Sequence, residues 1–317
     1  MKKLIKLLAA LALALSLTVI AAGAEDAPVR VGGLKGPTGM ALAHMMTEND
    51  GAYTFTLAGA PTELTGLLIK GDVDIAAVPV NLGAVLYNKT QGGVKALSLI
   101  TRGMLYVLEK GDSIHSVADL AGKTIVAAGQ GSTPEYVMNY ILEANGVEAD
   151  LDFKSEHAEV TTLALNGLAD VVLVPEPHVT TLMTKEPAYR KALDITEEFA
   201  AAARKKGVEN AQLSMSVVVV RSEFCAAHPE KVAAFMQALE ASIAFANENV
   251  AEAAQEIAEQ GIIASAAVAE KALPSCSLVF ISGEEMQAQA APLYDILFAA
   301  NPASVGGAAP AEDYYVK

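Results

Sequence analysis

Hydroxyl groups stand in a turn where they could hold a small polar molecule. The segment 129–134, Gly-Gln-Gly-Ser-Thr-Pro, follows a strand-like run and opens a helix. Free backbone N–H groups at a helix start, together with two hydroxyls, suit an anion or another hydrogen-bond acceptor. Ser132 with Glu135 three residues later also fits a capping box, and the two roles are compatible. From this turn we expect ligand contact by Gln130, Gly131, Ser132 and Thr133.

Three further turns, at 36–39, 79–81 and 175–177, also follow strand-like runs. Thr38 and Asn81 are typical capping residues for the helices that come next. The carboxyl ends of parallel strands meet at one edge of a sheet, and two such edges that face each other make a cleft. The pattern therefore predicts a binding cleft, to which these turns contribute Pro37, Thr38, Val80, Asn81 and Glu176.

Two charged residues near these turns have open roles. Glu176 is the one acid in the four turns. It suits a ligand amine or amidine, or else it is a solvated acid that favours the positive end of a helix dipole. Arg102 lies where the chain leaves the first group of elements, and it either meets a ligand carboxylate or sulfonate or stays exposed at a hinge. The sequence leaves both pairs of alternatives open.

Catalytic and metal-binding patterns are missing from the sequence. The five histidines form no His-Glu-x-x-His and pair with no Cys-x-x-Cys. No Gly-x-Ser-x-Gly elbow is present, and Cys225 has no evident partner base. The 129–134 turn lacks the third glycine of a dinucleotide fingerprint and the Gly-Lys-Ser/Thr of a P-loop. We therefore expect a protein that is not an enzyme and that holds no cofactor and no metal.

Strand-like and helix-like segments alternate in two groups, at 29–102 and 104–214. This order predicts two α/β units, each a mainly parallel sheet with helices on both faces. A β-rich run at 213–220 is expected to cross back to the first unit, and the amphipathic helix at 229–247 to pack on it. No Pro/Ser-rich linker is present, which favours strand crossovers as the hinge. We expect one lobe to comprise 25–102 plus 218–317 and the other 103–217.

The N-terminus has the pattern of a secretory signal at 1–24. Lys2, Lys3 and Lys6 precede an apolar run, and the small residues at 22–24 fit a signal-peptidase site. The run is short for a membrane span. No cysteine near the cleavage point offers a lipid anchor, so we expect a protein that is free in the periplasm or outside the cell.

Composition limits the partners. The chain has a formal charge of −15, and removal of the three signal lysines makes it −15 − 3 = −18. Such an acidic chain argues against nucleic acid as a partner, and we expect a monomer. Tryptophan is absent, which argues against a carbohydrate platform of stacked indoles. In an oxidising compartment Cys225 and Cys276 either pair or remain buried thiols.

Motifs along the chain carry a family resemblance: Gly-Asp-Val-Asp-Ile-Ala at 71–76, the segment 116–125, Gly-Ser-Thr at 131–133, 166–170 followed by Pro-Glu-Pro at 175–177, 228–232, and the tail 305–315. In this order and spacing they resemble solute-binding proteins of ABC importers, in the group that handles nitrate, taurine, other sulfonates and thiamine pyrimidine precursors. The resemblance covers nearly the whole chain after residue 24. It implies a two-lobed periplasmic-binding-protein fold (type II) with two hinge crossovers, and an ABC permease in the membrane as partner.

The resemblance leaves alternatives for the activity. The pyrimidine synthase of thiamine biosynthesis resembles this family, but it relies on a cysteine-rich site with a PLP-linked lysine, and only Cys225 and Cys276 exist here. A sensor or chemoreceptor adaptor is the other candidate. Helix starts and hydroxyls suit a sulfonate or nitrate-like anion, whereas Glu176 suits a nitrogen-containing organic solute. No aromatic residue lies at 36–39, which weakens the case for a pyrimidine.

Overall fold

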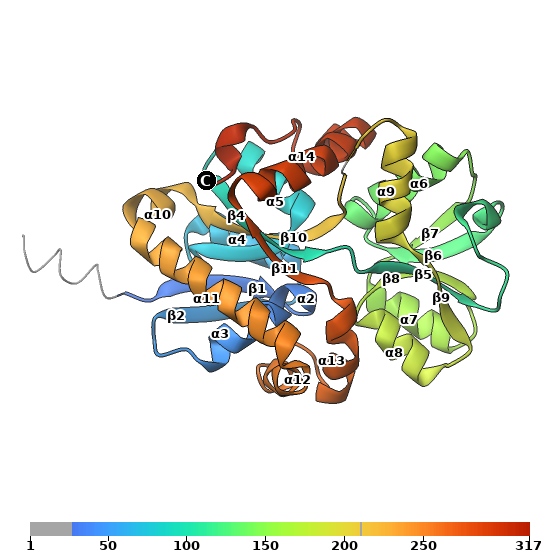
Figure 1. Cartoon of the computed structure of the whole chain (residues 1–317), viewed down its shortest axis with the longest axis horizontal. Coiled ribbons are helices and arrows are strands. Elements are labelled where there is room, and N and C mark those ends of the chain that lie inside the picture. The colour runs from blue at the N-terminus through green and yellow to red at the C-terminus, as the bar shows by residue number, and fades with distance from the viewer. Residues whose placement is uncertain (1–26, 210) are drawn as a thin grey trace, which may run out of the picture.

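Two lobes lie side by side in the computed structural model, which describes residues 27–209 and 211–317 (Figure 1). Each lobe is a β-sheet flanked by helices, so the predicted two-lobed α/β architecture is confirmed. Both sheets are mixed rather than mainly parallel, because β10 and β11 in one sheet and β5 in the other run antiparallel to their neighbours. The predicted signal sequence at 1–24 lies outside the described residues. None of the helices described combines the length and the apolar character that crossing a bilayer requires.

The first lobe is built on a six-stranded sheet with the order β11-β4-β10-β3-β1-β2. β1 pairs in parallel with β2 and β3, whereas β10 is antiparallel to both β3 and β4, and β11 is antiparallel to β4. β1 to β4 therefore share one direction, which β10 and β11 oppose. The strands are β1 (Val29–Leu34), β2 (Tyr53–Ala58), β3 (Ile75–Pro79), β4 (Val94–Arg102), β10 (Ser214–Arg221) and β11 (Leu278–Ser282).

Both faces of this sheet are buried. Along β3, Ile75 and Ala77 face one core, and Ala76 and Val78 face the other. Successive side chains of a strand point to opposite faces of the sheet. Because both faces are covered here, every position of the strand is apolar, which explains the continuous apolar runs in the sequence. One face is covered by α2 (Pro37–Met40), α3 (Ala43–Thr47), α11 (Pro229–Glu248), α12 (Val250–Glu259) and α13 (Ala266–Ala272), and the other by α4 (Pro61–Lys70), α5 (Val80–Lys89) and α14 (Gly283–Ala300).

The second lobe has a five-stranded sheet with the order β7-β6-β8-β5-β9. β6 is parallel to β7 and β8, and β5 is antiparallel to β8 and β9. The strands are β5 (Leu105–Lys110), β6 (Thr124–Ala128), β7 (Asp150–Lys154), β8 (Val171–Pro175) and β9 (Tyr189–Asp194). Its faces are covered by α6 (Thr133–Asn145) and α9 (Ile195–Lys205) on one side, and by α7 (His157–Leu165) and α8 (His178–Lys185) on the other.

The chain crosses between the lobes twice. It leaves the first sheet at the end of β4 and enters β5 after two intervening residues, and it returns from α9 to β10. The β-rich run at 213–220 therefore lies in the first sheet, as predicted. The first crossover is tight, because a Cβ added at Gly103 would lie 2.1 Å from Thr196 Oγ1. Glycine thus lets the crossover pack closely against the start of α9.

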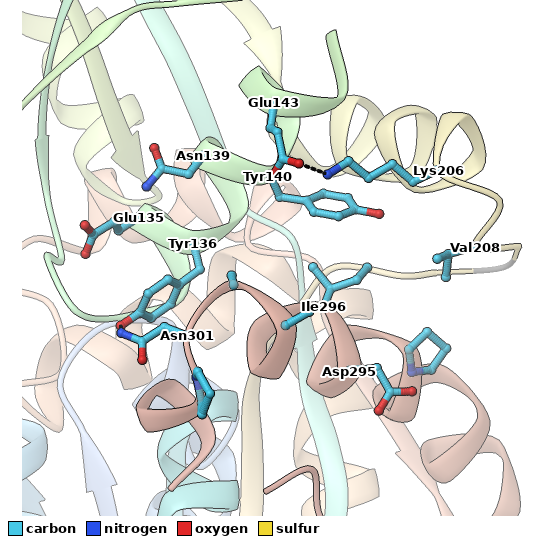
Figure 2. A pocket seen from close by; sticks show the side chains of 14 residues that line it. Glu135, Tyr136, Asn139, Tyr140, Glu143, Lys206, Val208, Asp295, Ile296 and Asn301 are labelled. Carbon is cyan, nitrogen blue, oxygen red and sulfur yellow. Dashed lines mark hydrogen bonds and ion pairs between the residues drawn. The ribbon is translucent and has the colours of Figure 1, made fainter. Parts of the chain in front are cut away.

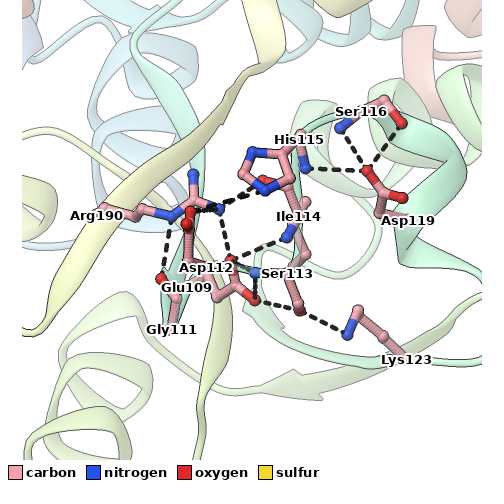
Figure 3. A network of polar contacts seen from close by, with 10 residues as sticks. All are labelled: Glu109, Gly111, Asp112, Ser113, Ile114, His115, Ser116, Asp119, Lys123 and Arg190. Atoms are coloured by element: carbon pink, nitrogen blue, oxygen red, sulfur yellow. Dashed lines mark hydrogen bonds and ion pairs between the residues drawn. The ribbon is translucent and has the colours of Figure 1, made fainter.

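A polar network fixes the end of β5 in the second lobe (Figure 3). The Glu109 carboxylate is 3% exposed and accepts hydrogen bonds from the backbone N–H groups of Ser113 and Ile114. It also forms an ion pair with the Arg190 guanidinium, with a nitrogen–oxygen distance of 2.8 Å. Burial acts to raise the pKa of Glu109, but the bonds from Ser113 and Ile114, together with Arg190, hold it below its usual value. The network joins β5 to β9 and to the loop that follows β5.

In the second lobe, Ser116 and Asp119 form a capping box at the start of a 3₁₀ turn. Two predicted helix starts in the first lobe are wrong. Thr38 does not cap a helix: α2 begins at Pro37, and the helix expected after the 36–39 turn is divided into α2 and α3. Asn81 does not cap α5, which begins one residue earlier, at Val80. At 37, proline fixes φ near the helical value and starts the helix before the capping residue.

Candidate functional site

Hydroxyl groups gather at the edge of the first sheet that faces the second lobe. Ser216 of β10 pairs with Pro79 of β3 on one side and with Thr101 of β4 on the other. The hydroxyl oxygens of Thr38 and Ser216 are 3.5 Å apart, and both residues are buried. The structure therefore brings Thr38, a predicted ligand residue, together with Ser216, which the sequence reasoning did not single out.

Unpaired polar atoms lie at the same edge. Thr101 Oγ1, Ser214 Oγ and Arg102 Nε are buried and have no hydrogen-bond partner within the described residues. Thr101 and Ser214 are fully buried, and Ser214 pairs with Arg102 in the strand register. Buried polar groups are normally hydrogen-bonded, so three unpaired ones at one place indicate a site that receives a polar partner. Arg102 is not the exposed hinge residue that one alternative expected, because its Nε is buried.

A side-chain hydrogen bond joins the two lobes in the middle of the interface. Thr133, in the first turn of α6, donates from Oγ1 to Asn81 Oδ1 over 3.3 Å. Asn81 in turn donates from Nδ2 to the backbone carbonyl of Ser304 over 3.4 Å. Thr133 is 2% exposed and Asn81 is 8% exposed. Two of the predicted ligand residues, one from each lobe, thus meet directly.

The rest of the 129–134 turn is occupied with its own contacts. Ser132 is at the N-cap position, but its hydroxyl donates to the carbonyl of Gly129 over 2.6 Å. The Glu135 carboxylate accepts from the backbone N–H of Gly131, one residue before the N-cap. The predicted capping box is therefore wrong, because a capping glutamate must take the N–H of the N-cap residue itself. Gln130 and Gly131 are exposed.

The other two predicted ligand residues of the first lobe, Pro37 and Val80, lie apart from these hydrogen bonds. Pro37 is the first residue of α2 and is half-buried. The Val80 side chain is fully buried in the core, and its carbonyl accepts from the Tyr294 hydroxyl over 3.2 Å. Ligand contact by Pro37 or Val80 stays a prediction, as it does for the residues of the 129–134 turn.

Glu176 belongs to a second polar cluster, which includes Lys191 and Tyr106 of its own lobe and Ser275 of the first lobe. Glu176 is 1% exposed, so the alternative of a solvated acid is wrong. One carboxylate oxygen accepts from the Thr180 N–H over 3.0 Å, and the other is 3.4 Å from Lys191 Nζ. The same ammonium lies 4.0 Å from the centre of the Tyr106 ring and donates to Ser275 Oγ of the first lobe over 3.3 Å. This cluster combines a carboxylate, an ammonium and an aromatic face.

Burial shifts the ionisation of the groups around this cluster. It raises the pKa of Tyr106 to about 12, with further contributions from Asp194 and Glu176. It also raises the pKa of the Cys276 thiol, which lies near Glu176 and is fully buried. Cys225 and Cys276 are both free, so the alternative of a disulfide is not realised. A neutral, buried thiol is a poor nucleophile.

Two histidines pack together near the start of α8. The rings of His157 and His178 are 5.7 Å apart between centroids, and His178 Nδ1 is 3.1 Å from Thr161 Oγ1. Burial and the neighbouring His178 lower the pKa of His157 to about 4. Burial also lowers the pKa of His178, so burial favours the neutral form of both rings. Among the described residues, no group of three or more potential ligands could hold a metal ion.

A groove of about 930 Å³ lies between α6 and α14 (Figure 2). It is on the α6 face of the second sheet, opposite the face covered by α8. Tyr136 and Tyr140 of α6 line one wall, and Ile296 of α14 lines the other. Asn301 of the first lobe donates to the Tyr136 hydroxyl over 3.1 Å, which joins the lobes on this side as well. Lys206 lies over the Tyr140 ring and pairs with Glu143. The four predicted turns contribute no residue to this groove, which is thus distinct from the polar edge.

Sequence reasoning missed most of the residues that surround the predicted ones. Ser214 and Ser216 alternate with apolar residues at the head of the 213–220 run, and that period-two pattern was the available signal. Lys191 and Ser275 gave no signal, because β9 is a short strand of mixed polarity and Ser275 lies in a 3₁₀ turn.

A family model described as NMT1/THI5-like matches residues 59–253, which is more than half of the chain. No curated protein shows significant sequence similarity to the chain.

Solved structures show the same fold at low identity. An ABC transporter structure from Parabacteroides distasonis has 22% identity and a TM-score of 0.78, over 92% of this chain and 99% of that one. The periplasmic aliphatic sulphonate binding protein SsuA from Escherichia coli has 16% identity and a TM-score of 0.71, over 92% of each chain. The alkanesulfonate-binding protein SsuA from Xanthomonas axonopodis pv. citri, bound to MOPS, has 17% identity and a TM-score of 0.64, over 86% of this chain and 93% of that one.

Proposed function

The chain belongs to the NMT1/THI5-like family, and from this premise we propose that it is the solute-binding component of an ABC importer. In this role the protein acts outside the cytoplasm as a monomer, binds one small polar solute between its lobes, and presents the closed form to a permease in the membrane. The moving units are the lobe of the six-stranded sheet and the lobe of the five-stranded sheet. Because all of β10 (Ser214–Arg221) lies in the six-stranded sheet, residues 214–217 move with 25–102 and 218–317, and the other unit is 103–213. Binding energy then acts as a population shift towards the closed form.

One observation carries the proposal: buried polar groups without partners lie at the edge where the lobes face each other. Thr101, Arg102 and Ser214 supply two hydroxyls and a guanidinium there. The hydroxyls of Thr38 and Ser216 lie beside them. The hydroxyls can donate hydrogen bonds, and a guanidinium donates paired, charge-assisted hydrogen bonds to oxyanions. We therefore propose a solute with an oxyanion group, such as a sulfonate or a nitrate-like anion.

The charge balance supports the same solute class over a nitrogen-containing cation. Glu176, the residue that suits an amine, is already paired with Lys191 of its own lobe. Arg102 makes no ion pair within 4.0 Å among the described residues. Of the two charged residues that the sequence singled out, Glu176 and Arg102, the one without an opposite charge among the described residues is therefore the positive one.

A thermal-shift and calorimetric screen of residues 25–317 tests the proposal, with sulfonates, nitrate, amino acids, pyrimidines and polyamines as probes. A solute at about 100 times its Kd adds roughly 2.7 kcal/mol of stability, which is readily detected. We expect a hit among the oxyanions that Arg102→Met or Ser214→Ala weakens by about tenfold or more, whereas the groove variant Lys206→Met leaves it unchanged. Binding of polyamines only, lost in Glu176→Gln, would instead identify an amine receptor.

An enzyme on the same fold and a sensor remain the alternatives to transport. Turnover of any panel compound by the purified protein would favour the enzyme. Solute binding without uptake in cells that also carry the permease would favour the sensor.

A further inference from the structure

Lys191 of the second lobe contacts both lobes. Its ammonium interacts with Glu176 and Tyr106 of its own lobe and donates to Ser275 Oγ of the first lobe over 3.3 Å. We propose that Lys191 is a positioning residue for solute capture, which holds the lobes together through Ser275 and so sets how readily they close. This rests on the proposed function, because it assigns Lys191 a part in lobe closure.

Contacts within the second lobe fix the Lys191 side chain before the lobes meet. The Glu176 carboxylate is 1% exposed, and a carboxylate withdrawn from water needs a nearby cation. The face of the Tyr106 ring, 4.0 Å away, stabilises the same ammonium. A flexible lysine normally loses side-chain entropy when it forms a contact. Here that entropy is lost within one lobe, so little remains to be lost when Ser275 arrives.

The contact with Ser275 exists only when the lobes are together. Ser275 ends the 3₁₀ turn Leu273–Ser275, which follows α13, and α13 contacts α8 across the interface. A rotation of one lobe separates Ser275 from Lys191 but leaves the Lys191–Glu176 pair intact, because both members belong to the second lobe. The hydrogen bond therefore stabilises the closed arrangement alone, and its donor is charged, which strengthens it.

The role of Lys191 differs from charge recognition. Lys191 and Glu176 neutralise each other, so the pair adds no net charge to the site. Among the described residues Arg102 forms no ion pair, and its buried Nε has no hydrogen-bond partner. Arg102 therefore recognises the solute, and Lys191 acts on the equilibrium between open and closed lobes.

Distances between spin labels on the two lobes measure this equilibrium without any solute. Suitable label positions are Ile69→Cys in the first lobe and Leu168→Cys in the second, whose side chains are 58% and 71% exposed. The background carries Cys225→Ser, because Cys225 is only half-buried. Cys276 stays in place, since it is fully buried and burial raises the pKa of its thiol. The labelled protein is compared with and without Ser275→Ala.

We expect Ser275→Ala to reduce the population at the short, closed distance by about fivefold relative to the open one, the lower end of typical coupling effects. Ser275→Thr restores that population, and Lys191→Met lowers it. The matched control Lys206→Met, which alters an ammonium–tyrosine contact within one lobe, leaves the distances unchanged. The urea midpoint of Ser275→Ala stays at the wild-type value, which separates a change in closure from a loss of structure.

Two outcomes overturn the proposal: a wild-type protein without a short-distance population, or one whose distances Ser275→Ala does not alter. Failure of the proposed function looks different. It leaves these label distances responsive to Ser275→Ala while no probe in the solute screen binds.

Discussion

Two lysines of this protein lie over a tyrosine ring beside a glutamate, and the two clusters differ mainly in burial. Lys206 is 2.8 Å from a Glu143 oxygen, and the Glu143 side chain is 76% exposed. Lys191 is 3.4 Å from a Glu176 oxygen, and Glu176 is 1% exposed. The shorter ion pair is thus the one in water, where screening leaves little of its energy. The longer pair is withdrawn from water, where losing one partner is expensive.

The clusters also differ in what they join. The pair of Lys206 with Glu143 lies within the second lobe. Lys191 reaches the first lobe as well, through Ser275. Burial and position at an interface, more than the length of the ion pair, decide which of the two clusters contributes to the stability of the protein and to the contact between its lobes.

The largest difference is expected on loss of the ammonium. Lys191→Met lowers the free energy of unfolding by about 2 kcal/mol, because it leaves the buried Glu176 carboxylate without a cation. The double variant Lys191→Met/Glu176→Gln recovers more than half of this loss. Urea denaturation measures both. Equal instability of the single and double variants would show that the lysine stem, not its charge, is what matters.

Alkaline pH distinguishes the two tyrosines. The pKa of Tyr106 is raised to about 12, so the unfolded chain loses this proton first, near pH 10. The resulting stability is fully present below pH 10 and is lost as the pH rises towards 12. Between pH 9 and 11.5 the wild type should lose about 1–2 kcal/mol more than Tyr106→Phe. Burial also raises the pKa of Tyr140, but Tyr140→Phe should change the profile less. If stability depended on pH in the same way for Tyr106→Phe and Tyr140→Phe, the two tyrosines would not differ in how burial affects their ionisation.

The groove cluster carries an unpaired hydroxyl. The hydroxyl of Tyr140 is buried and has no hydrogen-bond partner within the described residues. Tyr140→Phe should therefore stabilise the protein by about 0.5–1 kcal/mol at neutral pH, since an unsatisfied buried group is unfavourable. Thermal denaturation checks the sign. A destabilised Tyr140→Phe would mean that the hydroxyl is paired in solution.

The smallest effect is expected for the exposed ion pair. Lys206→Met should change the free energy of unfolding by less than about 0.5 kcal/mol, because Glu143 remains hydrated when the lysine is lost. Urea denaturation at low and high salt should show that even this difference disappears when charges are screened. A loss as large as that of Lys191→Met would show that burial is not what separates the clusters.

The sequence predicted the fold because its strongest signals are repeated along the chain. Apolar runs such as 75–79 and 217–220 are covered on both faces. The helices that connect β1, β2 and β3 make these strands parallel neighbours. Gly71 and Gly146 end helices in the left-handed conformation, which glycine adopts without strain. These features depend on local pattern and need no knowledge of the other lobe.

The site was harder to predict because its residues meet only across the interface. Asn81 is a good capping residue by type, yet it contacts Thr133 of the other lobe instead. The pairing of Glu176 with Lys191 depends on the register of β5 and β9, neither of which had a clear pattern. Local propensity identified the turns, and tertiary contacts then reassigned the side chains within them.

One apolar cluster passes through both lobes, and this has a consequence for how the chain melts. Buried residues such as Leu293 and Val305 of the first lobe belong to the same cluster as Val137 and Phe199 of the second. Neither lobe can lose its packing without exposing part of the other. Calorimetry should therefore record a single heat-absorption peak, and either half expressed alone should be degraded or aggregate.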